Sequence, residues 1–174
     1  PDDYFTLSNA INYYIYDLNN YGYRLGFSTG VANNITFNTT IARNSVDQPM
    51  YPRYGSNISL SVSLTPPYSL WNDVDYETAD NATKYKWIEY NKWTFKADYY
   101  YELAKNLVLN TKAGFGYLGH FNDDIGPSPF EGYDLGGDGM TGYSLYGRET
   151  IALRGYENFS LTPIINGKKA GNLY

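Results

Sequence analysis

The sequence alternates apolar and polar residues over several long stretches, and this period of two is the feature that most constrains its fold. In residues 56–66, SNISLSVSLTP, isoleucine, leucine or valine occupies every second position from residue 58 to 64, and serines fill the positions between them. Side chains of a β-strand point alternately to opposite faces, so the pattern predicts strands with one apolar and one polar face. The predicted strands are residues 5–18, 35–45, 56–66, 88–102 and 107–119.

Strand length bears on the choice between a soluble β-sandwich and a membrane β-barrel. Both architectures produce the alternation. A sandwich packs one face of each sheet against the core and exposes the other to water, and a membrane barrel has one face against lipid and the other toward a polar interior. The predicted strands are longer than the globular norm of about 5–6 residues and match the roughly 9–11 residues of a membrane-spanning strand. Aromatic residues near the strand ends also favour the barrel, since membrane barrels carry aromatic girdles at both interfaces. These residues are Tyr13, Tyr14, Tyr16, Trp87, Tyr99, Tyr100, Tyr101 and Tyr117.

Composition removes several other classes of protein. No apolar run approaches the roughly 18 residues of a spanning helix, whereas a mean hydropathy of −0.50 is compatible with barrel strands that are half polar. The formal net charge of −5 provides no basic surface, so nucleic acid is not an expected partner. The absence of cysteine excludes a disulfide framework and a thiolate metal site. We expect no cofactor and no metal.

The connections between predicted strands differ in length. Residues 103–106 form a tight turn and residues 45–56 a moderate one, whereas residues 19–33, 66–86 and 120–170 form long loops. Outer-membrane barrels have short periplasmic turns and long extracellular loops. We therefore assign the short connections to the periplasmic side and the long ones to the extracellular side.

Three motifs stand out against this background. The first is a strand-turn-strand unit over residues 36–67, and the second is PFEGYDLGGDGM at residues 129–140. The third is LRGYENFSLTP at residues 153–163, where arginine precedes glycine and an aromatic residue. The residues singled out in these motifs are Tyr51, Pro52 and Gly55 in the first, Gly136 and Gly137 in the second, and Arg154, Gly155 and Tyr156 in the third.

In this order the motifs resemble the C-terminal barrel of the Omp85 superfamily, from about residue 5 to residue 163. The resemblance implies an all-β fold in which residues 1–174 are a fragment of one transmembrane antiparallel β-barrel domain, about six of sixteen strands. Residues 171–174 would begin a further strand. The loop that carries Arg154 would fold into the barrel lumen, where the arginine would be anchored by acidic and aromatic residues of later strands. Residues 141–153 depart from the family by being longer than its usual spacer.

The resemblance also implies a function without bond chemistry. The chain would belong to the outer-membrane machinery that folds and inserts β-barrel proteins, and it would not be an enzyme. Its partners would be outer-membrane lipids, nascent outer-membrane β-barrel proteins, accessory assembly subunits and the remaining barrel strands of the same protein. The alternatives are another translocation pore or assembly factor of the superfamily, a porin or TonB-dependent transporter, and a soluble glycan-binding sandwich.

A glycine-rich stretch and a histidine offer weaker signals. GFGYLG, residues 114–119, matches a dinucleotide-binding loop, but it lies inside a predicted strand rather than between a strand and a helix. We expect Gly114 and Gly116 instead to leave room in the lumen for the approach of a loop or strand. His120 lies near Asp123 and Asp124, and we expect it to be structural rather than catalytic.

An acidic segment at residues 73–80 offers carboxylate oxygens of the kind that calcium binds. The glycine of the EF-hand loop is absent from it. We therefore favour a solvated acidic loop over a calcium site. Its acidic residues are Asp73, Asp75, Glu77 and Asp80.

Overall fold

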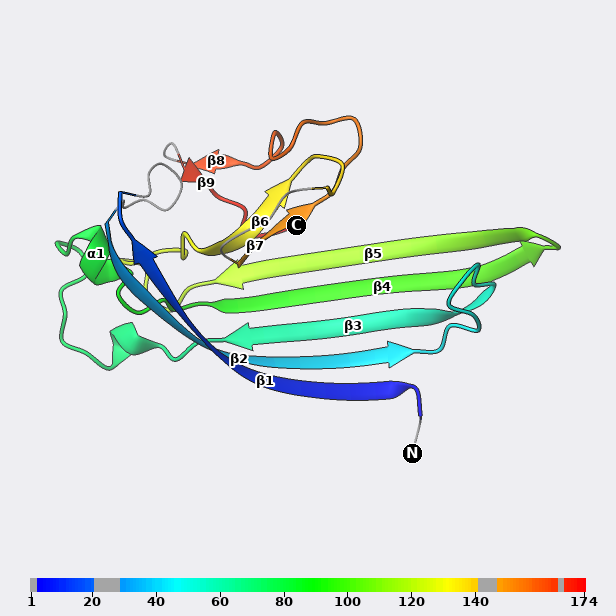
Figure 1. Cartoon of the computed structure of the whole chain (residues 1–174), viewed down its shortest axis with the longest axis horizontal. Coiled ribbons are helices and arrows are strands. Elements are labelled where there is room, and N and C mark those ends of the chain that lie inside the picture. The colour runs from blue at the N-terminus through cyan, green and yellow to red at the C-terminus, as the bar shows by residue number, and fades with distance from the viewer. Residues whose placement is uncertain (1–2, 21–28, 141–146, 166–167) are drawn as a thin grey trace.

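The computed structural model describes residues 3–20, 29–140, 147–165 and 168–174. Its main feature is a five-stranded antiparallel sheet in the order β1-β2-β3-β4-β5, so each strand pairs with its neighbours along the chain (Figure 1). The all-β antiparallel fold predicted from the alternation is confirmed. The strands are β1 (Phe5–Leu18), β2 (Gly30–Asn44), β3 (Tyr54–Leu64), β4 (Asn91–Ala104) and β5 (Leu107–Gly119).

Three strands differ in their bounds from the sequence-based prediction. Strand β2 begins five residues earlier, because it continues to pair with β1 as far as Leu18 opposite Gly30. Strand β3 ends before two prolines, which lack the N–H that a ladder requires. Strand β4 begins only at Asn91, because the preceding residues turn toward β2, where the Ile88 amide donates to the Asn33 carbonyl at 2.8 Å.

The two faces of the sheet differ in chemistry, as the alternation predicts. Across the apolar face, Leu60 lies opposite Phe95, and Phe95 lies opposite Phe115. These side chains have no covering layer among the described residues, and Ile11 is 71% exposed. The opposite face carries serine, threonine, asparagine and lysine and is the concave one in Figure 1. Apolar exposure on this scale is costly in water and favourable in lipid.

The predicted loop over residues 120–170 contains four short strands, so its description as a continuous loop is wrong. Strands β6 (Glu131–Leu135) and β7 (Gly147–Ile151) form a parallel pair over the concave face of the large sheet (Figure 1). Strands β8 (Ile164–Ile165) and β9 (Lys168–Lys169) form a two-residue antiparallel pair. The sequence pattern did not reveal them because all four have five residues or fewer, which is too short for a period to be read.

The last residues of the chain extend the large sheet beyond β5. The Gly116 amide donates to the Tyr174 carbonyl at 3.2 Å, the Tyr174 amide donates to the Gly116 carbonyl at 3.1 Å, and the Leu118 amide donates to the Asn172 carbonyl at 2.8 Å. This antiparallel pairing agrees with the expectation that residues 171–174 begin a further strand.

A small hydrophobic core lies at the end of the sheet where the long loops gather. Phe130 is fully buried and its ring stacks on Tyr16 at 4.7 Å. The loop before β4 contains two short helices, η1 (Tyr68–Leu70) and α1 (Asn81–Lys84). Among the described residues, no helix has the length and apolar character needed to cross a membrane. The core residues are Leu18, Ala32, Tyr76, Tyr85, Ile88, Tyr90, Leu118, Ile125, Phe130 and Tyr133.

Candidate functional site: the polar face and the strands that cover it

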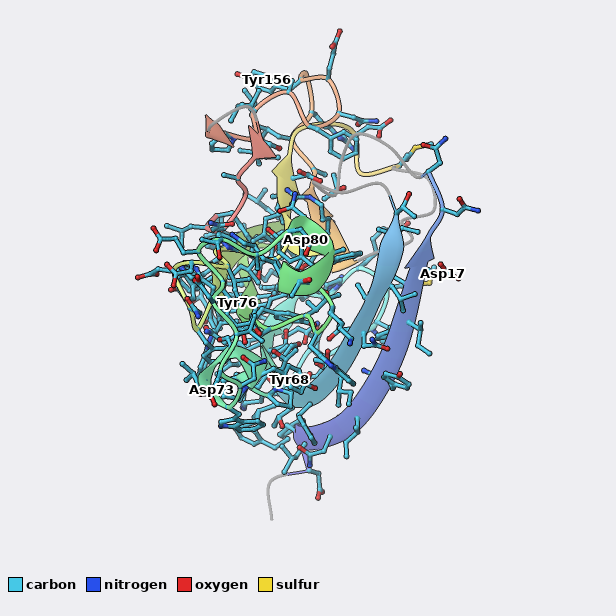
Figure 2. All side chains as sticks on the ribbon, turned by 90° about the vertical axis from the view of Figure 1, so that its left-hand side faces the viewer. Asp17, Tyr68, Asp73, Tyr76, Asp80 and Tyr156 are labelled. Carbon is cyan, nitrogen blue, oxygen red and sulfur yellow. The ribbon has the colours of Figure 1, made fainter. Side chains whose placement is uncertain are left out.

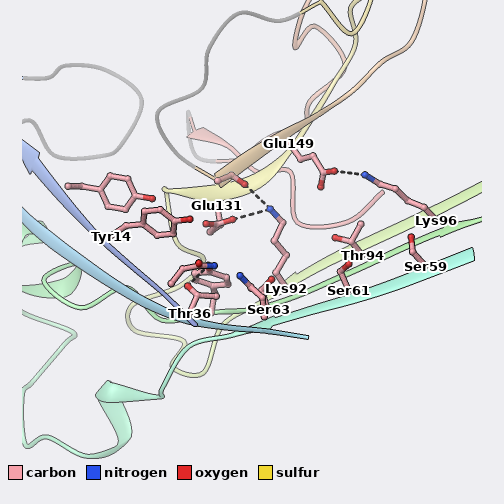
Figure 3. Close-up of a pocket in the computed structure, with 15 residues that line it drawn as sticks. Tyr14, Thr36, Ser59, Ser61, Ser63, Lys92, Thr94, Lys96, Glu131 and Glu149 are labelled. Atoms are coloured by element: carbon pink, nitrogen blue, oxygen red, sulfur yellow. Dashed lines mark hydrogen bonds and ion pairs between the residues drawn. The ribbon is translucent and has the colours of Figure 1, made fainter. Parts of the chain in front are cut away.

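A cavity of about 680 Å³ lies between the polar face of the sheet and the β6–β7 pair (Figure 3). Strands β1 to β4 contribute hydroxyl, amide and ammonium groups to its floor, and β6 and β7 contribute Glu131 and Glu149 to its roof. The alternation produces this arrangement, because alternate residues of β1 to β4 point to the polar face that forms the floor of the cavity. The cavity is therefore polar and carries opposite charges on its two sides.

The two covering strands are joined by a pair of buried charges. Arg148 on β7 donates from Nε to Asp134 Oδ2 at 3.0 Å and from Nη2 to Asp134 Oδ1 at 2.8 Å. Its Nη1 also donates to the Glu131 carbonyl at 3.2 Å. The guanidinium lies against Gly132, where a Cβ would come within 2.6 Å of Nη1. A bidentate pair of this kind fixes geometry as well as contributing energy.

Two lysines of β4 connect the covering strands to the large sheet. Lys92 Nζ lies 3.0 Å from Glu131 Oε2 and donates to the Gly147 carbonyl at 2.7 Å. Lys96 Nζ lies 2.6 Å from Glu149 Oε1. The first pair is almost buried, with side-chain exposures of 13% and 7%, whereas the second is more open at 55% and 34%. Figure 3 shows both contacts crossing from β4 to the strands above it.

Tyr133 of β6 forms a neutral contact with the same sheet. Its hydroxyl donates to the Trp93 carbonyl at 3.0 Å and lies 3.1 Å from Thr94 Oγ1. Burial raises the pKa of Tyr133 to about 12, so the phenol stays protonated and able to donate. Its own backbone amide donates to the Gly171 carbonyl at 2.7 Å, which ties β6 to the last residues of the chain.

The glycines of residues 114–119 have the spatial role that the sequence suggests. A Cβ at Gly116 would overlap the ring of Tyr174 and lie 2.6 Å from Tyr133 Cζ. A Cβ at Gly114 would lie 3.4 Å from the Tyr174 ring, which is ordinary contact. The prediction that glycine here leaves room for the approach of a loop or strand is confirmed at Gly116, which the rings of Tyr133 and Tyr174 approach, whereas at Gly114 a side chain would meet only ordinary contact.

The structure brings two of the three motifs together. The amide of Gly136 donates to the Ile151 carbonyl at 3.1 Å, and the amide of Leu153 donates to the Gly137 carbonyl at 2.8 Å. Both glycines have positive φ, +115° and +100°, and a Cβ at Gly136 would lie 2.6 Å from the Glu157 carbonyl oxygen. The glycine pair thus packs against the chain on both sides of the Arg-Gly-Tyr sequence.

The Arg-Gly-Tyr sequence itself lies at an exposed turn. Arg154 and Tyr156 are exposed, and Gly155 has a φ of +90°, which glycine adopts without strain. Within the part of the chain that the structure describes, no carboxylate lies within ion-pair distance of Arg154. Its anchoring in the lumen stays a prediction.

The first motif lies far from the other two, at the end of the sheet with the short turns. Tyr51 has a φ of +55° and is 88% exposed, and Pro52 is half-buried beside it. Gly55 has a φ of +108°, and a Cβ there would overlap the backbone of Ser45. This glycine therefore allows the turn between β2 and β3 to close.

The remaining candidates form local contacts. His120 Nε2 lies 2.9 Å from Asp123 Oδ1, and the Asp123 side chain is fully exposed. Asp75 accepts from the Glu77 amide and the Thr78 hydroxyl, at 3.1 and 2.8 Å. Asp80 accepts from the Thr83 amide and caps α1. Among the described residues, no group of three or more His, Cys, Asp or Glu side chains is arranged to bind a metal ion.

Three of the residues assigned to an aromatic girdle lie on the polar face. Tyr100 shares the face of Lys96 on β4. Tyr14 and Tyr16 line the polar cavity, so the assignment of these tyrosines to the membrane interface is wrong. Successive residues of a strand alternate between faces, and a run of neighbouring tyrosines cannot all point to one side. Tyr13, which directly precedes Tyr14, stays on the apolar face and is 56% exposed.

The charged residues of β6 and β7 were not singled out from the sequence. The sequence did indicate that such acidic residues exist, because Lys92 and Lys96 lie on the polar face of a predicted strand and require carboxylate partners. The missing information was which of the chain's 18 acidic residues would reach them.

Long antiparallel strands with an uncovered apolar face and a polar face that a loop covers define the wall of a transmembrane β-barrel. The comparison with protein families agrees: the model described as the Omp85 superfamily domain matches residues 3–172. The chain belongs to the Omp85 superfamily, and its fold is part of a barrel of that type. Neither the search of curated proteins nor the search of solved structures gave a match.

Membership has a general consequence for location and activity. Proteins of the superfamily lie in the outer membrane of bacteria or of organelles, and in general they insert or translocate proteins. The apolar face of the sheet is accordingly the surface that meets lipid, and the concave polar face is the lumen side.

Proposed function

We propose that this chain is part of a BamA-like protein of the outer-membrane β-barrel assembly machinery, the BAM complex, which folds and inserts other β-barrel proteins. The observation that carries the proposal is the lumen-side segment itself. It begins at β6 and contains the glycine pair and the Arg-Gly-Tyr motif. The buried Lys92–Glu131 ion pair fixes it to the wall, and the Arg148–Asp134 pair joins its two strands. No bond is made or broken in this function, and no cofactor is required.

The mechanism we propose is strand pairing at the edge of a barrel. An incoming strand would add to an open strand edge of the insertase by main-chain hydrogen bonds, the β-augmentation mode. Strands β1 to β5 are paired with one another without interruption, so they would supply a stable part of the wall rather than the opening. The lumen segment would keep that wall in shape while the opening is occupied.

Within this proposal Arg154 would anchor the loop to acidic or aromatic residues of other barrel strands. Guanidinium suits this role, because it offers both a planar fork for carboxylates and a face for aromatic rings. We expect Arg154→Ala to lower the heat stability of the full-length protein or its assembly activity. Full activity of Arg154→Ala together with unchanged heat stability would show that Arg154 does not anchor the loop.

The proposal is tested by adding an unfolded β-barrel substrate to vesicles that contain the full-length protein with its accessory subunits. Accelerated appearance of the heat-modifiable folded form of the substrate is the expected result. The nearest alternative is another Omp85 translocation pore or a TamA-like factor. Transport of a non-barrel polypeptide across the vesicle wall, with no acceleration of barrel folding, would favour the pore and contradict our proposal.

A further inference from the structure

An exposed aromatic turn lies at the long-loop rim of the sheet. Residues 66–71, here called the rim turn, contain two prolines and helix η1 and end at Trp71. Leu70 is 63% exposed and Trp71 is 71% exposed, and Val74 just beyond is 42% exposed. An apolar surface of this kind on a loop is uncommon unless it meets a partner.

The rim turn is held rigidly by a buried carboxylate. Glu89, only 3% exposed, accepts a hydrogen bond from the Ser69 amide at 2.9 Å and another from the Ser69 hydroxyl at 2.7 Å. The amides of Leu70 and Trp71 each donate to the carbonyl three positions back, at Pro67 and Tyr68, both at 3.1 Å. The exposure of Leu70 and Trp71 is therefore a fixed feature of the turn.

The rim turn is continuous with the lipid-facing surface. The Tyr68 ring lies 5.0 Å from the Trp87 ring and 6.3 Å from the Trp71 ring. Trp87 forms a bridge with Asn33 of β2, and Asn33 accepts a hydrogen bond from the hydroxyl of Tyr13 at 2.9 Å. Tyr13 lies on the apolar face, so a series of contacts that passes through Asn33 leads from the apolar face to the rim turn.

The turn lies on the outer side of the barrel wall. In Figure 1, η1 lies beyond the ends of the strands on the convex side of the sheet, away from β6 and β7. In Figure 2, Tyr68 and Asp73 lie in the lower part of the view, and Tyr156 of the lumen-side segment lies at its upper end. The acidic residues follow the turn directly, so the chain changes from apolar to charged within a few positions.

We propose that the rim turn is a membrane-interface anchor, with Leu70 and Trp71 inserted at the boundary between acyl chains and headgroups of the outer leaflet. Tryptophan prefers this boundary, because its ring is apolar and its N–H needs a polar neighbour. Glu89 acts as the positioning residue that holds the turn against the wall. The inference goes beyond the proposed function and does not depend on which protein the barrel inserts.

The test uses nitroxide labels on the full-length protein in phosphatidylcholine vesicles. The chain has no cysteine, so Leu70→Cys, Asp73→Cys and Leu60→Cys each give one labelled site here, with any cysteine elsewhere replaced by serine. The ratio of collision rates with oxygen to those with a water-soluble nickel chelate reports lipid contact. We expect this ratio at residue 70 to be several-fold above that at residue 73 and to approach that at residue 60.

A ratio at residue 70 equal to that at residue 73 would overturn the proposal. Protection of residue 70 from both probes would overturn it as well, because another part of the protein would then cover the turn. A second variant isolates the role of Glu89. With Glu89→Ala, the residue 70 label should gain mobility and its ratio should fall toward that of residue 73, whereas Glu77→Ala in the same loop should leave both unchanged.

Discussion

The guanidinium of Arg148 and the carboxylate of Asp134 are joined by two hydrogen bonds of 2.8 and 3.0 Å, and this pair links strand β7 to strand β6. Both side chains are largely buried, at 14% and 11% exposure. The two strands run parallel and are five residues long, so the ladder between them is short. The ion pair therefore contributes much of what specifies this arrangement.

We expect Arg148→Ala to destabilise the full-length protein strongly. Removing one partner of a buried ion pair typically costs about 3–5 kcal/mol, because the other charge stays buried without compensation. The double variant Arg148→Met with Asp134→Leu should cost less than Arg148→Ala alone, since neither charge then remains. Urea unfolding of the detergent-folded protein measures both. A double variant that loses as much free energy of unfolding as Arg148→Ala, or more, would contradict this account of the pair.

The two lysine contacts of β4 should differ in how much they contribute to the free energy of unfolding. Lys92→Met leaves Glu131 buried without its partner, and we expect a loss of about 3 kcal/mol or more in the free energy of unfolding. Lys96→Met is the matched control, because Lys96 and Glu149 are more exposed and such pairs contribute about 0–1 kcal/mol. The same urea experiment compares them. Equal losses for the two variants would show that burial does not set the strength of these contacts.

The long strands could be predicted from the sequence because their period of two persists over many residues, as from residue 58 to residue 64 in β3. The strands β6 and β7 could not, because their side chains are polar or charged at most positions and face partners that are remote in sequence. Glu131 contacts a lysine 39 positions earlier, and no local pattern records that distance. The role of the glycines could be predicted because it depends on a local pattern. Gly114 and Gly116 interrupt the polar face of an otherwise regular strand.

The cap of helix α1 should depend on pH. Hydrogen bonds from Thr83 lower the pKa of Asp80 from its ordinary value of 3.8. Because the folded-state pKa lies below the unfolded one, the stabilisation is complete above the unfolded pKa and is lost as the pH falls through the folded pKa. At pH about 5 the Asp80→Ala variant should be cut by pepsin faster than the wild type in residues 73–85, and this difference should disappear toward pH about 2.

Asp80→Ser is the control for this measurement. Serine caps a helix well without a carboxylate, so its cleavage rate at pH about 5 should stay close to that of the wild type. Its rate relative to Asp80→Ala should also be independent of pH over this range, since no group titrates at the cap. A pH-dependent ratio between these two variants would place the titrating group elsewhere in the loop.

Gly116→Ala should separate the covering strands from the wall, and Gly114→Ala should not. The methyl group at residue 116 would overlap the Tyr174 ring and lie 2.6 Å from Tyr133 Cζ, whereas at residue 114 the nearest atom is at 3.4 Å. Overpacking of this kind costs about 1–3 kcal/mol. Both changes replace glycine by alanine in the same strand, so any effect of backbone entropy is shared and favours alanine slightly in each.

Urea unfolding should therefore show a loss in the free energy of unfolding for Gly116→Ala only. Equal stability of the two variants would mean that Tyr133 and Tyr174 do not pack against β5 in the folded barrel.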